Sequence, residues 1–172
     1  MRRPKRNLLD ENSLYDYAVA TLGRRMHSVA ELKRKLRNRC PEEGMIERVI
    51  VRLKDQKYLS DSNYAAAYSA FRRDNQKFGR RRVITDLKVK GVHGDVIEKA
   101  VEEAYSGVDE LKLARAFLKR KRLMKPTNNQ DAARVFRALM RAGFGVSSSI
   151  KVLKNWDVEE EVLTALQEET ES

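Results

Sequence analysis

Few residues of this chain combine in a pattern that could support catalysis or hold a metal ion. His27 and His93 stand in predicted turns, and neither has a second histidine or a cysteine at the spacing of a metal site. The sequence has no glycine-rich phosphate loop ending in Lys-Ser or Lys-Thr, and Gly143-Phe144-Gly145 lacks the rest of a dinucleotide fingerprint. We therefore expect no catalytic site, no metal and no cofactor, and do not predict an enzyme.

Cys40 is the single cysteine, so the chain cannot form an internal disulfide, which favours a reducing compartment. Arg37 and Arg39 lie nearby, but Cys40 aligns with glycines of an internal repeat, so we interpret it as a small structural residue. The basic N-terminus lacks the apolar stretch of a signal peptide, and no uncharged segment is long enough to span a membrane. We expect a soluble, cytoplasmic protein.

The charge of the chain is strongly positive and unevenly distributed. It contains 36 Lys and Arg against 25 Asp and Glu, a net charge of +11. All 36 basic residues lie before residue 155, whereas the segment 157–172 is acidic. A body this basic attracts polyanions, because neutralising phosphates releases condensed counterions. Two interpretations of the acidic tail stay open: a solvated helix, or a segment that folds over the basic surface and competes with a polyanion.

Two groups of basic residues are the candidates for contact with a polyanion. The first basic cluster brackets Gly79 at the start of a predicted helix and continues along its exposed side; it comprises Lys77, Arg80, Arg81, Arg82 and Lys88. The second basic cluster lies on one face of a later helix, with three members at i, i+4 and i+7; it comprises Arg115, Lys119, Arg120 and Arg122, with Lys121 beside them. Each residue alone could be an ordinary solubilising side chain, but together with the net charge they favour a polyanion partner.

The first basic cluster carries a further expectation. Cations at a helix N-terminus oppose the helix dipole, whose positive end prefers a negative charge. A phosphate bound at this helix N-terminus would compensate the four basic residues there.

The aromatic residues argue against recognition by base stacking. Six of them fall on predicted apolar stripes: Tyr64, Tyr68, Phe71, Phe117, Phe136 and Trp156. Few rings then remain to stack on bases, and no recognition helix stands out. We therefore expect contacts with the nucleic-acid backbone rather than with base edges.

An internal repeat predicts the elements that position the two clusters. Apolar pairs recur at steps of 51 and then 52 residues: Leu32 and Leu36, then Val83 and Leu87, then Val135 and Leu139. At the same steps the turn after this helix holds Cys40, then Gly91, then Gly143, and the expected N-cap is Ser28, then Gly79, then Asp131. The register of these apolar positions favours tandem repeats over the alternative, a single globular bundle of unrelated helices.

Each repeat is predicted to contain three helices, from apolar residues at helical spacing. Ser28 and Glu31 form a capping box at one helix start, and Asp61 is expected to cap another. The segment Pro41-Glu42-Glu43 suits the first turn of a third helix, and Gly91 a left-handed C-cap. A final short helix near 158–169 is predicted to be amphipathic.

The predicted fold is all-α: a tandem array of three three-helix repeats, elongated and curved, with a short C-terminal acidic helix. The expected segments are a basic N-terminal segment at 1–12, repeats at 13–60, 61–107 and 108–156, and the acidic tail at 157–172. With only 8 Gly and 3 Pro, the chain has too few turn residues for a dozen short strands.

Three segments, in this order and at these intervals, resemble the RecX family. They are Ser28-x-x-Glu31-Leu32-x-x-Lys35-Leu36, then Tyr58-Leu59-Ser60-Asp61, then Phe78-Gly79-Arg80-Arg81-Arg82-Val83-Ile84-x-x-Leu87-x-x-Lys90-Gly91-Val92. The resemblance covers nearly the whole chain and is clearest from about 14 to 105. The chain departs from the family at Arg80, where relatives often have Pro, and in the more divergent third repeat.

The resemblance implies a negative regulator of RecA. RecX proteins are short tandem arrays of three-helix repeats that lie in the groove of the RecA filament on single-stranded DNA. They inhibit its ATPase, strand-exchange and coprotease activities, and so modulate recombination, DNA repair and the SOS response. The implied partners are the RecA nucleoprotein filament and, weakly, single-stranded DNA; we expect a monomer and no membrane contact.

Two other functions remain open from the residues alone. The chain could be a general nucleic-acid-binding helical repeat protein that acts without a recombinase. It could also be a protein-interaction scaffold whose charge serves solubility only.

Overall fold

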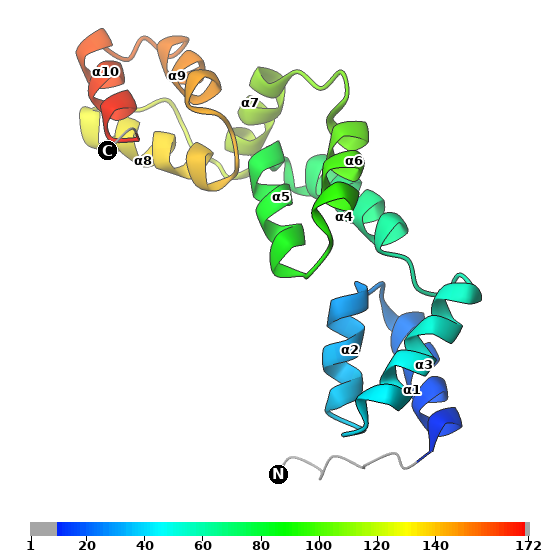
Figure 1. Cartoon of the computed structure of the whole chain (residues 1–172). Helices are drawn as coiled ribbons and strands as arrows, with labels where there is room; N and C mark the ends of the chain where they lie inside the picture. Colours follow the sequence, from blue (N-terminus) through cyan, green and yellow to red (C-terminus); the bar gives the residue numbers. More distant parts are fainter. Residues whose placement is uncertain (1–9, 171–172) are drawn as a thin grey trace. The chain divides into compact units, whose positions relative to one another are not determined.

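The computed structural model describes residues 10–170, and every regular element in this part of the chain is an α-helix. Ten helices follow one another: α1 (Glu11–Arg24), α2 (Val29–Arg37), α3 (Glu43–Asp55), α4 (Asp61–Gln76), α5 (Arg80–Val89), α6 (Gly94–Tyr105), α7 (Glu110–Arg120), α8 (Asn129–Arg141), α9 (Val146–Lys154) and α10 (Glu160–Glu168) (Figure 1). The predicted all-α fold, with helices in groups of three and a short acidic helix at the end, is confirmed.

Two helix starts differ slightly from the prediction. Helix α1 begins at Glu11, so the end of the expected basic segment 1–12 is helical, while its residues 1–9 lie outside the described chain. Helix α3 begins at Glu43 with Glu42 at its N-cap, so of the segment Pro41-Glu42-Glu43 expected in its first turn only Glu43 is helical. None of the described helices is long and apolar enough to cross a membrane.

The described chain forms two compact units. The first unit takes the chain up to Ala67 together with Leu87–Glu98, and the second takes Tyr68–Asp86 together with the chain from Lys99 onward. Each unit has its own apolar core, and the second group of three helices, α4–α6, is divided between the two units. The core of each unit is therefore described by itself.

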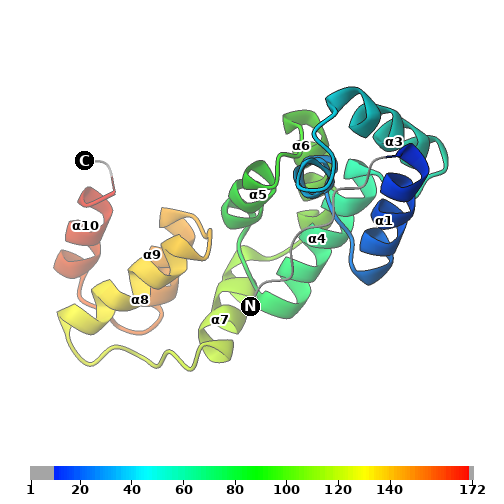
Figure 2. The ribbon, with the colours of Figure 1, turned by 90° about the horizontal axis from the view of Figure 1, so that it is seen from below.

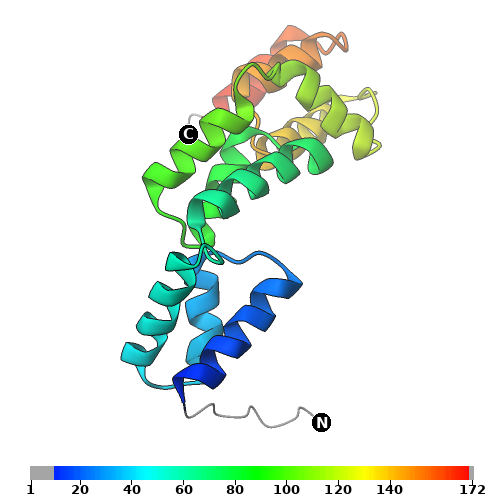
Figure 3. The same ribbon diagram turned by 90° about the vertical axis from the view of Figure 1, so that its right-hand side faces the viewer.

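The core of the first unit lies among α1, α2 and α3, which Figure 3 shows as three neighbouring helices. Apolar side chains at helical spacing point inward from each helix. The fully buried ones are Leu14, Ala18, Leu32, Leu36, Ile46, Val49 and Leu53. Cys40 is buried beside them, which agrees with a structural role for this residue.

The core of the second unit lies among α7, α8, α9 and α10 (Figure 2). Phe117 of α7 packs against Phe144 with ring centroids 5.9 Å apart. Leu163 and Leu166 of α10 are buried in this core. The acidic helix at the end of the chain is thus anchored by its apolar stripe and is not a free solvated helix.

The helix caps confirm one prediction and correct two. Ser28 and Glu31 form both hydrogen bonds of a capping box at the start of α2. At the start of α4 the cap is Ser60, whose Oγ accepts from the Asn63 amide at 3.2 Å. Asp61 instead reaches α2, where its carboxylate accepts from the Val29 amide at 2.8 Å.

The N-cap of α8 is also not the predicted residue. Asn128 caps this helix, its side-chain oxygen accepting from the Asp131 amide at 2.8 Å. Asp131 therefore lies in the first turn, where its charge suits the helix dipole. The prediction was wrong because α8 begins earlier than the repeat register implies.

Phe71 does not lie in the core, contrary to its predicted place on an apolar stripe. Its side chain is 52% exposed, whereas Tyr64 on the same helix is buried. The inward face of α4 runs through Tyr64, Ala65 and Ser69, and Phe71 falls outside it. Although Phe71 lies seven residues after Tyr64, a helical spacing that usually returns to the same face, its side chain falls outside this narrow buried face.

In two places, the turn after the second helix of one repeat contacts the start of the second helix of the repeat before it. The turn after α5 contacts the start of α2, and the turn after α8 contacts the start of α5. At the first junction, in the first unit, the Ser28 hydroxyl donates to the Lys90 carbonyl at 2.6 Å. The Lys90 ammonium pairs with Glu31 at 2.9 Å, and Gly91 lies so close that a Cβ there would stand 2.5 Å from Ala30. Gly91 has φ +73°, as its predicted C-cap role requires.

The second junction, in the second unit, repeats this arrangement. The Gly79 amide donates to the Ala142 carbonyl at 2.8 Å, and the Arg81 amide donates to the Gly143 carbonyl at 3.2 Å. Gly143 has φ +90°, and a Cβ on it would stand 2.5 Å from the Arg82 Cβ. The C-terminal end of α8 thus lies directly on the N-terminal end of α5.

The first junction holds a buried histidine with a predictable effect on stability. His27 is 4% exposed, and its Nδ1 has no hydrogen-bond partner within residues 10–170. Burial, together with the charge of Arg25, lowers its pKa below the ordinary 6.5, although Glu31 opposes this. The folded protein therefore favours neutral His27, and this contribution to stability is complete above pH 6.5 and lost as the pH falls through the lowered pKa.

We expect acidification from about pH 7.5 to about pH 5.5 to destabilise the first unit, in a range where carboxylates stay charged. His27→Phe, which places here the residue that the repeat has at Phe78, should reduce this loss. His93→Phe is the control, because His93 is exposed in its turn. Thermal unfolding followed by circular dichroism at both pH values measures the effect, and equal pH dependence of the two variants would contradict it.

Candidate nucleic-acid and filament interface

The residues of the first basic cluster lie on and just before α5, and they fall into two electrostatic classes. Arg80 pairs with Glu102. Arg82 pairs with Asp86, with Nε 3.0 Å from Oδ1. Arg81 and Lys88, in contrast, are exposed and form no ion pair with any described residue. Arg81 and Lys88 are therefore the members whose charge is free to meet an outside anion.

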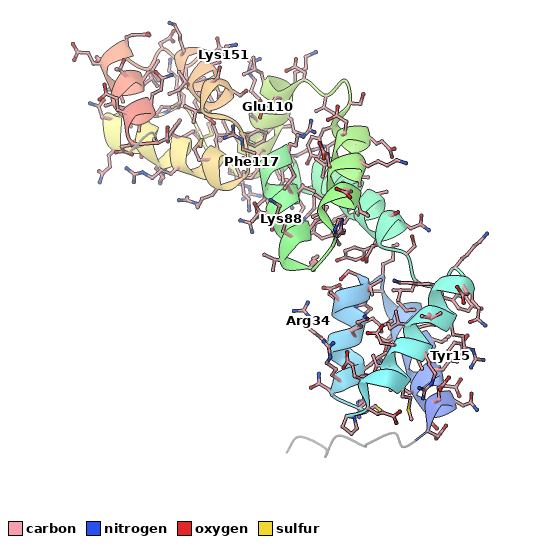
Figure 4. All side chains as sticks on the ribbon, viewed as in Figure 1. Tyr15, Arg34, Lys88, Glu110, Phe117 and Lys151 are labelled. Carbon is pink, nitrogen blue, oxygen red and sulfur yellow. The ribbon has the colours of Figure 1, made fainter. Side chains whose placement is uncertain are left out.

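Lys77 and Lys88 complete the placement of this cluster. Lys77 follows α4 in a left-handed conformation, with φ +58°, and is half-buried. Lys88 is on the exposed side of α5, two turns along from Arg81 (Figure 4). Lys88 thus continues the exposed side of α5 beyond Arg81, as the sequence predicted, whereas Lys77 lies before the helix.

A phosphate is not needed at the start of α5. The Gly79 and Arg81 amides donate to carbonyl oxygens at the end of α8, so the negative end of that helix faces the positive end of α5. Carbonyl groups of the protein's own backbone therefore supply the negative charge that we expected from a bound phosphate, and the prediction of a phosphate at this helix start was wrong. The Gly79 and Arg81 amides are therefore not available to an anion at this cluster.

Asp86 holds Arg82 and Arg72 in place. The Arg72 guanidinium donates to Asp86 at 2.6 Å, and the Tyr68 hydroxyl donates to the same oxygen at 3.1 Å. Burial raises the pKa of Tyr68, and the nearby Asp86 acts in the same direction. This largely buried network fixes the guanidinium of Arg82 on the α5 surface.

The second basic cluster is exposed along α7. Arg115, Lys119 and Arg120 are exposed, and no ion pair to them occurs in the described chain. Their side chains lie away from Ala114 and Phe117, which are buried. The predicted separation of a basic face from an apolar face is therefore seen on α7.

Arg122 is not on the helical stripe of α7. The helix ends at Arg120, and Arg122 has φ +55° while the Leu123 amide donates to the Leu118 carbonyl at 3.0 Å. This is the left-handed residue of a helix-ending motif that usually contains glycine. The i+7 position assigned to Arg122 was wrong, although its charge remains exposed at the end of the same helix.

Because Arg122 has a left-handed backbone conformation, it can be replaced by glycine without loss of stability, so the contribution of its charge to binding can be tested separately. Arg122→Gly should remove one cation and relieve backbone strain, raising stability by about 1 kcal/mol. Lys57→Gly is a matched control, because Lys57 also has φ near +60° but lies outside both clusters. We expect only Arg122→Gly to weaken binding to polyanions, by roughly severalfold. Unfolding and fluorescence anisotropy with oligothymidylate measure the two effects; equal binding by both variants would exclude Arg122 from the interface.

A hollow of about 430 Å³ lies where α5, α7 and α8 meet. It is lined by Phe78, Arg82, Phe117, Lys121, Leu123, Ala138, Arg141 and Ala142. Figure 4 labels Phe117 at this meeting point. Arg82 of the first cluster and Lys121, which follows Arg120 of the second, thus line the same hollow.

Arg141 is a basic residue of this site that sequence reasoning missed. It is exposed at the end of α8 and, like Lys121, forms no ion pair within the described residues. A basic residue in the last turn of a helix is ordinarily explained by the helix dipole. Only the contact of α8 with α5 gives Arg141 a place beside Arg82.

The acidic tail pairs with other basic residues. Glu160 contacts Lys154 at 3.1 Å, and Asp157 contacts Lys125 at 2.8 Å. A carboxylate oxygen of Glu169 lies 3.9 Å from Arg137. These three ion pairs join the tail to Lys125, Arg137 and Lys154, which belong to neither basic cluster; residues 171 and 172 lie outside the described chain.

Two family models match successive parts of this chain. RecX, first three-helix domain, matches residues 15–53, and RecX, second three-helix domain, matches residues 60–101. The regulatory protein RecX of Leptothrix cholodnii is 33% identical over 147 residues, covering 86% of this chain and 91% of that protein. The regulatory protein RecX of Geobacillus thermodenitrificans is 30% identical over 132 residues, but this chain spans only about half (49%) of its length.

A solved structure supports the same fold. The crystal structure of RecX from Lactobacillus salivarius has a TM-score of 0.71 with this chain and 19% sequence identity. The match covers 86% of this chain and 96% of the other.

Proposed function

Since the chain belongs to the RecX family of regulatory proteins, we propose that it is a negative regulator of RecA that binds the RecA–single-stranded-DNA filament. In this proposal it lies in the filament groove, contacts DNA phosphates and acidic protein surfaces, and inhibits ATPase, strand-exchange and coprotease activities. The regulated processes would be recombination, DNA repair and the SOS response. Binding across several protomers would disfavour the movements that ATP hydrolysis requires.

One observation carries the proposal beyond the family. Arg81, Arg115, Lys119 and Arg120 are exposed, and the described structure supplies no carboxylate for them. Uncompensated cations on a chain of net charge +11 favour contact with phosphates, which releases counterions. We assign the interface to the nine residues of the two basic clusters together with Lys121 and Arg141. All of them lie in the proposed second and third repeats, 61–107 and 108–156.

Inhibition of the filament ATPase tests this function. Purified protein added to RecA filaments on single-stranded DNA should suppress ATP hydrolysis at substoichiometric to equal ratios. Co-sedimentation with the same filaments should recover the protein in the pellet. No suppression at equal ratios would overturn the proposal.

Phe71 favours a second candidate, direct binding of single-stranded nucleic acid without a recombinase. Its ring is 52% exposed, so it is available for stacking on a base. This candidate predicts tight binding to naked oligothymidylate, a steep dependence on salt, and a loss of affinity of roughly tenfold in Phe71→Ala. Weak binding to naked DNA together with strong binding to the filament would favour the regulator instead.

A further inference from the structure

The two junctions are equivalent in the repeat, but only the first is filled by its own side chains. At the first junction Glu31 and Lys90 pair at 2.9 Å and occupy the space between the turn and the helix. The repeat steps of 51 and 52 place Arg82 and Ala142 at the corresponding positions of the second junction. Ala142 is too short to replace the lysine, and Arg82 reverses the charge of the glutamate.

The hollow defined above lies at this second junction. Both Arg82 and Ala142 line it, and its 430 Å³ falls within the range of roughly 300–1,000 Å³ typical of ligand sites. Its floor is apolar, formed by two phenylalanines, Leu123 and two alanines. No carboxylate lines this hollow, because Asp86, which pairs with Arg82, is not among its lining residues.

The polar lining of the hollow limits what can complete it. The charged side chains at its edge are Arg82, Lys121 and Arg141, which only donate hydrogen bonds. A nucleobase presents donors as well as acceptors, and its donors would find no acceptor among these side chains. A carboxylate needs donors only, and Arg binds it in a two-pronged geometry.

The aromatic lining gives a second reason to exclude a stacked base. The guanidinium of Arg72 stands 5.0 Å from the Phe78 ring centroid, and that of Arg82 stands 5.9 Å from it. Phe117 is only 4% exposed and is tilted against Phe78. These rings are therefore engaged by the protein's own groups, and they offer an apolar wall rather than a free stacking face.

We propose that this hollow binds an acidic peptide segment of a partner protein, in which an aromatic or aliphatic side chain is flanked by carboxylates. The apolar side chain enters between Phe117, Leu123 and Ala138. The flanking carboxylates meet Lys121 and Arg141, and one of them shares Arg82 with Asp86. The site thereby gains a protein contact that is separate from the phosphate contacts of Arg81 and the α7 face.

Fluorescence anisotropy with short labelled peptides tests the proposal in the absence of RecA and DNA, so its failure is distinct from failure of the proposed function. The probe is a peptide of sequence Glu-Asp-Phe-Asp-Glu, and the comparison peptide carries Ala in place of Phe. The Phe peptide should bind at least about tenfold more tightly, because one aromatic side chain leaves water. Equal affinities would overturn the proposal.

Variants then locate the binding site. Ala138→Trp should fill the hollow and reduce the affinity for the Phe peptide to that for the Ala peptide. Ala66→Trp, on the exposed side of α4, is the matched control. Arg141→Glu should weaken both peptides by about tenfold, whereas Arg34→Glu, exposed on α2, should not. Because Arg141 is exposed, this variant keeps the test valid if Ala138→Trp does not fold.

Oligothymidylate binding separates the two classes of ligand. The proposal expects Ala138→Trp to leave oligothymidylate affinity unchanged. If the tryptophan abolishes oligothymidylate binding and spares the Phe peptide, a nucleobase occupies the hollow and the proposal is wrong.

Discussion

Gly143→Ala is expected to lower the stability of the second unit by about 3–5 kcal/mol. Gly143 has φ +90°, a conformation that costs an L-residue on the order of 1–3 kcal/mol. Its new Cβ would also stand 2.5 Å from the Arg82 Cβ and closer still to the Arg82 amide. Relief requires α5 to move away from α8, which breaks the hydrogen bonds to the Gly79 and Arg81 amides.

Gly107→Ala separates the two causes of this loss. Gly107 also has a positive φ, +68°, but a Cβ there would meet nothing within 4 Å. It should therefore cost only about 1 kcal/mol, the conformational part. Urea unfolding followed by circular dichroism measures both variants, and faster hydrogen exchange of the Arg81 amide in Gly143→Ala would locate the damage. Equal losses would show that the close contact contributes nothing.

Reversing three unpaired cations is expected to weaken filament binding by about 100-fold. The variant is Arg81→Glu, Arg115→Glu and Lys119→Glu, all at exposed positions without an ion pair in the described structure. If each charge contributes roughly 1 kcal/mol, their loss amounts to about two orders of magnitude in Kd. The slope of log Kd against log salt should also fall, by about 2 for single-stranded DNA.

The control reverses three exposed cations outside both clusters. Arg24→Glu, Arg34→Glu and Lys54→Glu change the net charge equally, and these residues also lack ion pairs within residues 10–170. Co-sedimentation and ATPase inhibition should be lost in the first triple variant and largely kept in the second. If both variants fail alike, binding depends on net charge alone and the two clusters are not an interface.

The helices and their grouping could be predicted because their signals are local. The Ser28–Glu31 capping box and the apolar spacing of Leu32 and Leu36 depend only on nearby residues, and the structure shows both as expected. The N-cap residue of α8 could not be predicted. The repeat register indicated Asp131, but the helix begins three residues earlier in the chain, and Asn128 caps it. A repeat predicts equivalent positions only where loop lengths are also equal.

The candidate interface could be predicted in composition but not in arrangement. The sequence identified Arg80, Arg81 and Arg82 together, whereas the structure pairs Arg80 with Glu102 and Arg82 with Asp86 and leaves Arg81 unpaired. An ion pair with Glu102 depends on how α6 packs beside α5. No pattern within the three arginines could reveal that difference.

The sequence by itself therefore determined the helices, the tandem repeat and the basic surface, since hydrophobic periodicity, capping and charge act over a few residues along the chain. Tertiary structure alone decided three further features: the Gly79 and Arg81 amides donate to carbonyls at the end of α8, Arg141 lines the same hollow as Arg82, and that hollow remains open beside Ala142. These depend on which helix ends meet. That is set by the packing of segments some 60 residues apart, where Gly79 and Gly143 allow two backbones to touch.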